Sequence, residues 1–302
     1  MLAVNYLLVI LLGVLGNTST AAQKKYGRLV NGRTPSTNWY LVIHSVISIF
    51  NFAIMSKWQL GGDKTAVLFG FVYGFICAGS LLTHFIAYKK MNLIMISVFT
   101  KGNVVVSWLI GVTVFSEEIK ATSVISVLLI LIGVLMPLFR LKKSDNRKMS
   151  AAAYLLGLLM IFLGGCSTML TQTYFKLPET TSQSVSVMCF YTNVFFALIM
   201  MGVFLTSSRK SGGGLGITGE IKAVKPVYLL LVPICSVCQN LSSVTAAHVL
   251  KTMPLSIYTI FSTGASSIIL YIFSRFVFKE KVDKYELIAW LIATAAGLIT
   301  IF

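Results

Sequence analysis

The chain has 302 residues, of which 56% are hydrophobic and only 11% are charged. Soluble proteins carry about 25% charged residues, so this composition excludes an ordinary soluble fold and indicates a membrane protein. The formal net charge of +16 would suggest a nucleic-acid-binding surface on a soluble protein, but here the charges must first be placed relative to the apolar segments.

Apolar segments long enough to cross a bilayer recur along the whole chain. A transmembrane helix needs about 20 mostly apolar residues. The segments that meet this requirement are 2–22, 37–55, 65–87, 92–115, 121–139, 151–174, 184–206, 226–248, 254–274 and 285–302. They are continuously apolar, whereas barrel strands alternate in polarity, so α-helices are favoured. The sequence therefore predicts an all-α integral membrane protein with ten transmembrane helices.

The first segment, 2–22, differs from a removable signal peptide in two features. No positively charged residue precedes Leu2, and the apolar stretch is long for a signal sequence, so we expect it to be a helix of the folded protein.

Basic residues are distributed unevenly among the loops. The odd-numbered loops hold 19 Lys and Arg, the even-numbered loops hold five, and Lys101 lies inside the fourth segment. Positively charged short loops stay in the cytoplasm, which predicts cytoplasmic odd loops and external termini. We expect all 19 of these residues to be solvated and in contact with lipid headgroups. We also expect a bacterial cytoplasmic membrane and no nucleic-acid partner.

The two halves of the chain, 1–148 and 149–302, contain matching residues in matching order. At an offset of 162, Ser80, Thr83, Phe99 and Gly102 pair with Ser242, Thr245, Phe261 and Gly264. Each half holds five predicted helices, and because five is odd the second half enters the membrane from the opposite side. The sequence thus predicts two inverted five-helix repeats within one membrane domain. Inverted repeats of this kind recur in secondary transporters that work by alternating access.

A short signature follows the fourth helix of each half. It reads Phe115-Ser116-Glu117-Glu118, with Gly133-Val134 in the next helix, and Phe278-Lys279-Glu280, with Gly297-Leu298 in the next helix. With the ten helices and the repeat, it resembles the drug/metabolite transporter superfamily in its ten-helix EamA-like form. The resemblance implies a central cavity lined by helices 1, 3, 4, 6, 8 and 9, with helices 5 and 10 at the edge of the fold. A homodimer could form through helices 5 and 10. It fixes no substrate, and its members usually have cytoplasmic termini, unlike the charge distribution here.

Lys101 is the polar residue to which the sequence gives most weight. A lysine at the middle of a membrane helix costs about 2.5–3.5 kcal/mol on insertion scales, so intramembrane charges usually have a function. We expect Lys101 to bind an anionic group of a substrate; the alternative is a structural lysine paired with backbone carbonyls. All nine Asp and Glu lie in loops or at helix ends, which disfavours a cationic-drug substrate.

Further polar residues lie in the segments expected to line the cavity. Amides in hydrocarbon need hydrogen-bond partners, which makes Asn103, Gln239 and Asn240 candidates for substrate contacts. The hydroxyl and amide groups of other residues serve helix packing as often as binding. The remaining predicted substrate-binding residues are Asn17, Tyr73, Thr100, Thr168, Tyr258 and Thr263, the last being the repeat mate of Lys101.

The histidines and cysteines are dispersed and predict no metal site or cofactor. His44, His84 and His248 have no carboxylate or Cys at ligand spacing. We expect His44 to be a satisfied structural histidine. Cys235 and Cys238 fall within one predicted helix, so we read them, like the other cysteines, as small apolar residues.

These observations together predict a secondary transporter, and not an enzyme, for a small polar, anion-bearing metabolite such as an amino acid, organic acid, nucleotide sugar or phosphorylated metabolite. Two alternatives remain open. A membrane enzyme acting on lipid headgroups would need acid, base or metal-binding residues that converge, for example Glu117, Glu118, His248 and Lys251. A non-transporting scaffold would have a sealed core around Lys101.

Overall fold

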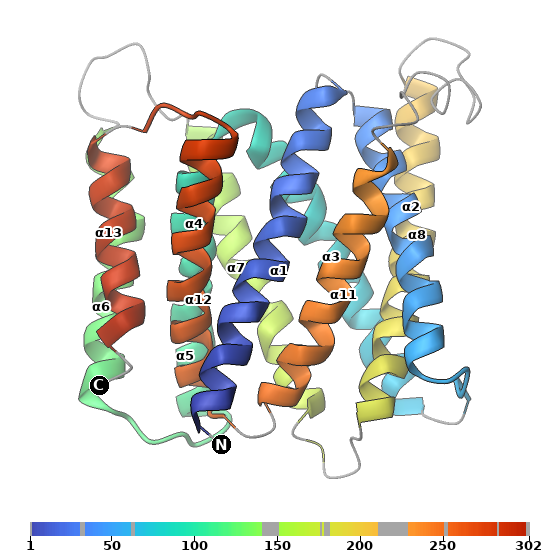
Figure 1. The fold of residues 1–302 in the computed structure, drawn as a ribbon, viewed down its shortest axis with the longest axis horizontal. Coiled ribbons are helices and arrows are strands. Elements are labelled where there is room, and N and C mark those ends of the chain that lie inside the picture. Colours follow the sequence, from blue (N-terminus) through green and yellow to red (C-terminus); the bar gives the residue numbers. More distant parts are fainter. Residues whose placement is uncertain are drawn as a thin grey trace. The chain divides into compact units, whose positions relative to one another are not determined.

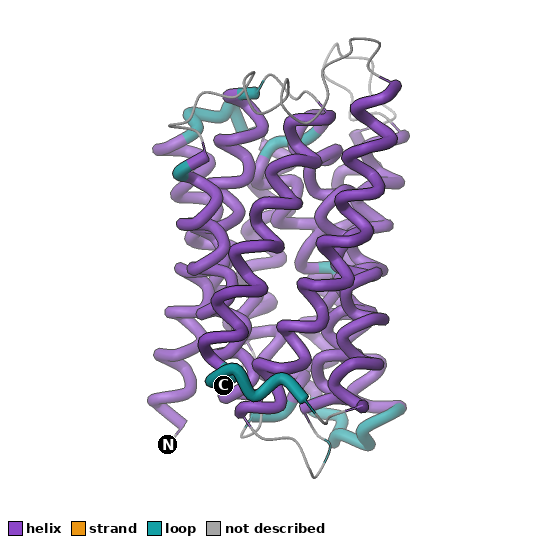
Figure 2. The backbone as a smooth tube through the Cα atoms, turned by 90° about the vertical axis from the view of Figure 1, so that its right-hand side faces the viewer, coloured by secondary structure: helices purple, strands orange, loops and turns teal. Residues whose placement is uncertain are grey.

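The described residues of the computed structural model form helices and no strand. They are residues 2–30, 34–61, 64–140, 151–175, 177, 182–210, 229–250, 253–282 and 284–299. Helices cover each of the ten predicted segments wherever these are described (Figures 1 and 2). The all-α prediction is therefore confirmed for this part of the chain.

The helices begin and end close to the predicted boundaries. In the first half they are α1 (Leu2–Leu29), α2 (Thr34–Met55), α3 (Lys64–Lys90), α4 (Leu93–Lys101), α5 (Asn103–Thr113) and α6 (Ala121–Arg140). In the second half they are α7 (Ala151–Phe175), α8 (Ser182–Lys210), α11 (Leu231–Leu250), α12 (Leu255–Ile272), the π-helical turn η1 (Phe273–Val277) and α13 (Lys284–Ile299). The predicted segment 92–115 is divided into α4 and α5 at Gly102.

Seven helical stretches are long and apolar enough to cross a membrane, judged by length and composition among the described residues. They identify the chain as a multi-pass integral membrane protein. The stretches are Val4–Leu29, Pro35–Met55, Lys64–Lys90, Leu93–Thr113, Ala151–Phe175, Val185–Ser208 and Ile260–Val277.

The chain divides into two compact units. Unit 1 comprises Met1–Asn17, Ile86–Thr173 and His248–Phe302, and unit 2 comprises Thr18–Phe85 and Tyr174–Ala247. Each unit therefore takes segments from both predicted repeats.

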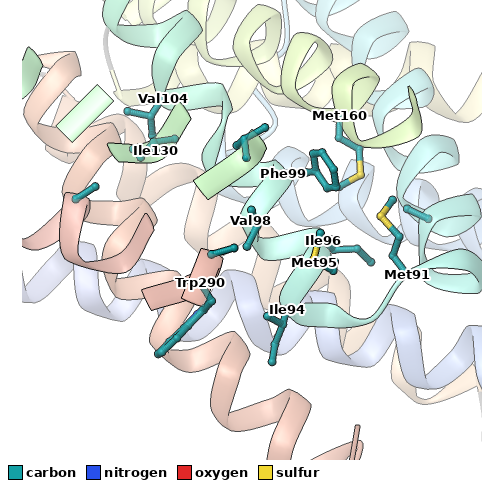
Figure 3. Packing of buried hydrophobic residues seen from close by; sticks show 14 of the residues in the cluster. Met91, Ile94, Met95, Ile96, Val98, Phe99, Val104, Ile130, Met160 and Trp290 are labelled. Carbon is teal, nitrogen blue, oxygen red and sulfur yellow. The ribbon is translucent and has the colours of Figure 1, made fainter. Parts of the chain in front are cut away.

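The core of unit 1 surrounds α4. Every residue of this helix except Thr100 is buried, and an apolar cluster around Phe99, Met160 and Trp290 encloses it (Figure 3). Within a membrane such side chains stabilise the fold through close van der Waals packing, because lipid is as apolar as they are. Within the unit α13 packs against α6, α12 and α4, which places Trp290 beside α4.

Glycines allow α7 to lie directly against α4 and α5. A Cβ atom on Gly157 would lie 2.5 Å from Cδ1 of Phe99, and one on Gly102 would lie 2.5 Å from Cδ1 of Ile161. Both distances are shorter than carbon atoms tolerate; a Cβ at position 157 would collide with the Phe99 ring, whereas one at position 102 would displace the end of the Ile161 side chain. The polar groups of unit 1 are thus set in densely packed surroundings.

The two signature motifs form the same turn. Ser116 and Lys279 both adopt a left-handed backbone, with φ of 51° and 50°. The Glu117 amide donates to the Gly111 carbonyl and the Glu280 amide to the Ser274 carbonyl, each at 3.0 Å. Because a positive φ is uncommon outside glycine, two identical turns at corresponding positions are a specific structural match.

Glu280 of the second motif also holds the start of α4. Its carboxylate accepts hydrogen bonds from the Leu93 amide at 3.0 Å and from the Ser274 hydroxyl at 2.9 Å. Asn92 caps the same helix, since its side-chain oxygen accepts from the Met95 amide at 2.8 Å. A carboxylate at a helix N-terminus accepts a hydrogen bond from a free N–H group and interacts favourably with the positive end of the helix dipole. The motif therefore has a structural task in unit 1.

In unit 2, α2 packs along α8, and α3 approaches α8 closely (Figure 1). Asn38 of α2 donates to Ser207 of α8 at 2.9 Å. A Cβ atom on Gly74 of α3 would lie 2.8 Å from the Thr192 carbonyl oxygen. These contacts join the start of α2 to the end of α8 and the middle of α3 to α8.

One expectation about the loops is wrong. Lys24 was expected to be solvated with the other basic loop residues, but α1 continues to Leu29 and the side chain of Lys24 is only 2% exposed. Several other expected loop residues, among them Lys142, Lys143 and Lys222, lie outside the described residues.

Candidate functional site

Unit 2 contains a cavity between α2, α3, α8 and α11. Its volume is about 60 Å³, counted as the space open to the centre of a water molecule. One water needs about 10–15 Å³ on this measure, so the cavity has room for about four waters or a small solute. The lining residues are His44, Phe52, Tyr73, Cys77, Leu81, Cys189, Thr192, Asn193, Phe196, Gln239, Asn240 and Ser243.

Two features hold the walls of the cavity in place. The hydroxyl of Ser236 in α11 donates to the carbonyl of His44 in α2 at 3.3 Å, which ties these two helices together at the level of the cavity. On the other wall, Gly74 allows α3 to contact the backbone of α8 at Thr192. The lining side chains thus project from helices whose relative positions within unit 2 are fixed.

Much of the polar lining is satisfied by the helices themselves. Thr192 donates to the Met188 carbonyl at 2.9 Å, Asn193 to the Cys189 carbonyl at 2.8 Å, and Ser243 to the Gln239 carbonyl at 3.0 Å. The side-chain oxygen of Gln239 accepts from Ser19 at 3.2 Å. These groups contribute polarity to the cavity and leave few donors free for a ligand.

His44 and Asn240 are different, because both are 3% exposed and both carry atoms without a hydrogen-bond partner among the described residues. Neither ring nitrogen of His44 is paired, and the Asn240 amide nitrogen, Nδ2, is unpaired. The Gln239 side chain lies close to His44 without the geometry of a hydrogen bond. A buried donor left unpaired costs about 1–3 kcal/mol, so these atoms need a partner that the protein does not supply.

The described residues that line this cavity include no Asp, Glu, Lys or Arg. The polar chemistry on offer is an amide donor, an imidazole, hydroxyl groups and two thiols, facing the aromatic rings of Phe52, Tyr73 and Phe196. Within the described residues, no group of three or more His, Cys, Asp or Glu is placed to hold a metal ion. The arrangement suits reversible binding of a polar molecule.

Lys101 belongs to unit 1, is 1% exposed, and is not among the lining residues. Its ammonium group, Nζ, donates to the Thr294 hydroxyl at 2.9 Å and to the Trp290 carbonyl at 3.4 Å, and it lies 5.7 Å from the centre of the Trp290 ring. Thr294 is itself paired with Ser267 at 3.0 Å. These contacts between α4, α12 and α13 agree with the structural alternative for Lys101, in which hydrogen bonds and a cation–π contact compensate the buried charge.

The structure brings together three of the predicted substrate-binding residues, Tyr73, Gln239 and Asn240, in the cavity of unit 2. The others belong to unit 1 with Lys101 and are not lining residues. They are Asn17, Thr100, Asn103, Thr168, Tyr258 and Thr263; the side chain of Thr263 lies outside the described ones.

Several residues of this second group have local structural contacts. Asn17 donates to the carbonyls of Gly13 at 2.6 Å and Ser266 at 3.1 Å. Thr100 and Thr168 each donate to the carbonyl four residues earlier, at 2.8 and 2.9 Å. Asn103 keeps one unpaired buried atom, its side-chain oxygen. Packing roles, the more frequent outcome for Thr in membrane helices, therefore account for these hydroxyl groups.

The expectation that His44 is a satisfied structural histidine is wrong, because neither of its nitrogens has a partner. A sequence signal for it existed. His44, Ser48 and Asn51 recur at helical spacing on α2, and all three carry unpaired buried side-chain atoms. A polar stripe of this period within an apolar span predicts a face directed at a cavity or a partner helix.

The residues named for a lipid-headgroup enzyme are only partly described. Glu117 and Glu118 follow α5, and His248 lies in the last turn of α11. Lys251 lies outside the described residues.

Comparison with known proteins shows a shared fold and no established family. No family model matches the chain, and no curated protein does. Among solved structures, 28 chains match. One of them aligns over 99% of this chain and 96% of its own length, with a TM-score of 0.56 and 12% sequence identity. It is described only as the crystal structure of a protein, so the likeness concerns the fold alone.

Proposed function

We propose that this protein is a secondary transporter that moves a small polar metabolite across a membrane by alternating access. The observation that carries the proposal is the cavity of unit 2, which His44 and Asn240 line; both are buried residues with side-chain atoms that have no hydrogen-bond partner among the described residues. Polar groups inside membrane helices that lack a protein partner are expensive and usually mark a substrate pathway.

The proposal includes ten membrane spans in two inverted repeats and membership of the EamA-like transporters. Two observations support it. Helices occupy the described parts of all ten predicted segments, and the two signature motifs form the same left-handed turn at Ser116 and Lys279. An inverted repeat gives two related conformations that can open a central site to either side in turn.

The anionic part of the predicted substrate is not retained in this proposal. It rested on Lys101, whose ammonium group is hydrogen bonded to Thr294 and Trp290. The metabolite is instead defined by the cavity, as a molecule that forms hydrogen bonds with Asn240, His44 and Gln239.

Uptake by proteoliposomes tests the function directly. Purified protein is reconstituted and exposed to a mixture of isotope-labelled polar metabolites, and the internal contents are identified by mass spectrometry. We expect at least one metabolite to accumulate with the wild type and to fall about tenfold with Asn240→Leu, because the unpaired amide is lost. Thr206→Val, which removes an exposed hydroxyl bonded within its own helix, serves as the matched control. Contents identical to those of protein-free liposomes would overturn the proposal.

A further inference from the structure

We propose that the cavity of unit 2 selects a small solute without net charge, which offers a hydrogen-bond acceptor to the Asn240 amide, and excludes ions of the same shape. This inference rests on the proposed function, because it names the substrate class of the same site. It follows from the unpaired side-chain atoms, the uncharged lining, the size of the cavity, and the hydrogen bonds that engage Lys101 in unit 1.

The first step concerns the unpaired groups. The Asn240 amide nitrogen has two N–H donors and no acceptor within reach, although the residue is 3% exposed. The two nitrogens of His44 are also unpaired, and a neutral imidazole has one donor and one acceptor. A ligand that satisfies these atoms must bring an acceptor to Asn240 and both a donor and an acceptor to His44. Amides and hydroxyl compounds carry both functions.

The second step concerns charge. A buried ion is tolerated when an opposite charge or a dense set of hydrogen bonds compensates the loss of water. In the part of the chain that the structure describes, the cavity lining has no carboxylate for a cation and no Lys or Arg for an anion. Of the described lining groups, the imidazole of His44 is the one that could become cationic, and the polar groups that line the same cavity from other helices, among them Tyr73, Cys77, Cys189 and Gln239, carry no charge in their ordinary forms. A neutral solute therefore loses the least hydration free energy when it enters the cavity.

The third step concerns size and the apolar wall. The volume of about 60 Å³ holds about four waters, which matches a solute of a few non-hydrogen atoms or the polar end of a larger one. Phe52, Leu81 and Phe196 supply the apolar part of the lining. Such surfaces contact a methyl or methylene group favourably and do not compensate a charged group for its lost hydration.

Lys101, the lysine that the sequence places at the middle of a membrane segment, is engaged within unit 1. Lys101 is bonded to Thr294 at 2.9 Å and is not among the lining residues. It supplies no counter-charge to the cavity lining, which separates this proposal from the anion-binding role expected from sequence.

Three probes of one shape and different charge test the proposal. Acetamide is neutral, acetate is an anion and acetamidinium is a cation at neutral pH, and each has one methyl group visible by proton NMR. Saturation-transfer difference spectra are recorded with the protein in lipid nanodiscs at matched ionic strength, and signals from protein-free nanodiscs are subtracted. Binding is thus measured without transport.

We expect the wild-type signal of acetamide to exceed those of acetate and acetamidinium about tenfold, because one unpaired donor is worth about that factor. Asn240→Leu should remove the acetamide signal, and Lys101→Met should leave it unchanged. Asn240→Asp, which replaces the donor with a carboxylate of the same shape, should bind acetamidinium in preference to acetamide. A misfolded variant cannot gain this preference, so the experiment does not depend on Asn240→Leu alone.

Three results would overturn the proposal. Equal wild-type signals for the three probes would show that the cavity does not discriminate by charge. An acetate signal that disappears with His44→Leu would show that the imidazolium form binds anions. An acetamide signal unaffected by both Asn240 variants would place binding elsewhere. If charge selection holds while proteoliposomes take up nothing, transport fails and the binding site stands; if acetate wins while metabolites accumulate, the substrate class fails and transport stands.

Discussion

Unit 1 and unit 2 each bury a nitrogen-bearing basic side chain within apolar helices, Lys101 in the first and His44 in the second. The ammonium of Lys101 has a hydroxyl and a carbonyl acceptor and an aromatic ring beside it. The imidazole of His44 borders a cavity and has no hydrogen-bond partner.

This comparison indicates that a buried charge alone does not identify a ligand-binding site inside a membrane protein. A charge costs so much to bury that the fold surrounds it with compensating groups, and those same groups keep it from a ligand. A neutral polar group costs less to leave unpaired, so it can be kept free for binding.

The largest effect is expected from Gly157→Val in unit 1. A Cβ atom at this position would lie 2.5 Å from Cδ1 of Phe99, a ring that is itself fully buried. Overpacking of this kind costs about 3 kcal/mol or more in the free energy of unfolding, measured by SDS titration in mixed micelles. The matched control is Gly202→Val, since nothing lies within 4 Å of a Cβ atom there. Equal losses for the two variants would contradict the packing assigned to α7.

The next effect concerns the partner of Lys101. Thr294→Val removes the hydroxyl that accepts from Nζ at 2.9 Å and leaves the ammonium short of a partner. We expect a loss of about 1–3 kcal/mol in the free energy of unfolding. The double variant with Lys101→Met should lose less than Thr294→Val alone, because the unpaired charge is then gone. Strict additivity of the two changes would argue against the contact.

A third effect separates stability from function in unit 2. His44→Leu removes a buried imidazole that has no hydrogen-bond partner, so we expect the melting temperature to stay the same or to rise. Uptake by proteoliposomes should fall about tenfold, which corresponds to about 1.4 kcal/mol. A lower melting temperature with normal uptake would show that His44 has a structural role.

The smallest effect is expected from Lys101→Met. Replacing a compensated buried charge by an apolar side chain of similar length is often close to neutral, so the free energy of unfolding should change by less than about 1 kcal/mol. Uptake should stay within about twofold of the wild type. Loss of uptake at unchanged stability would restore Lys101 as a substrate-binding residue.

Sequence reasoning located the helices well because the signal is long and redundant. Continuous apolar stretches bounded by charged or Gly-rich loops define membrane helices with little dependence on tertiary context. The extension of α1 to Leu29 was missed, since its last turns are polar and Lys24, which is buried there, looks like a loop residue in the sequence.

The candidate site was predicted only in part. Of the predicted substrate-binding residues, Gln239, Asn240 and Tyr73 line one cavity and Lys101 does not, whereas His44, which the sequence suggests is structural, does line it. The reason is that sequence shows which groups are polar but not which of them find partners. Lys101 pairs with Thr294, 193 positions away in the chain, and no local pattern predicts such a pairing.

Composition and hydrophobic length by themselves determined that this is an all-helical, multi-pass membrane protein, because only helices with internally satisfied backbones tolerate continuous apolar stretches in lipid. The tertiary structure alone decided which polar side chains are completed by neighbours and which are left open. In unit 1 close helix contacts at Gly102 and Gly157 accompany a completed network around Lys101. In unit 2 a cavity lies beside His44 and Asn240, and the side-chain atoms of these residues that lack a partner among the described residues identify the candidate binding site.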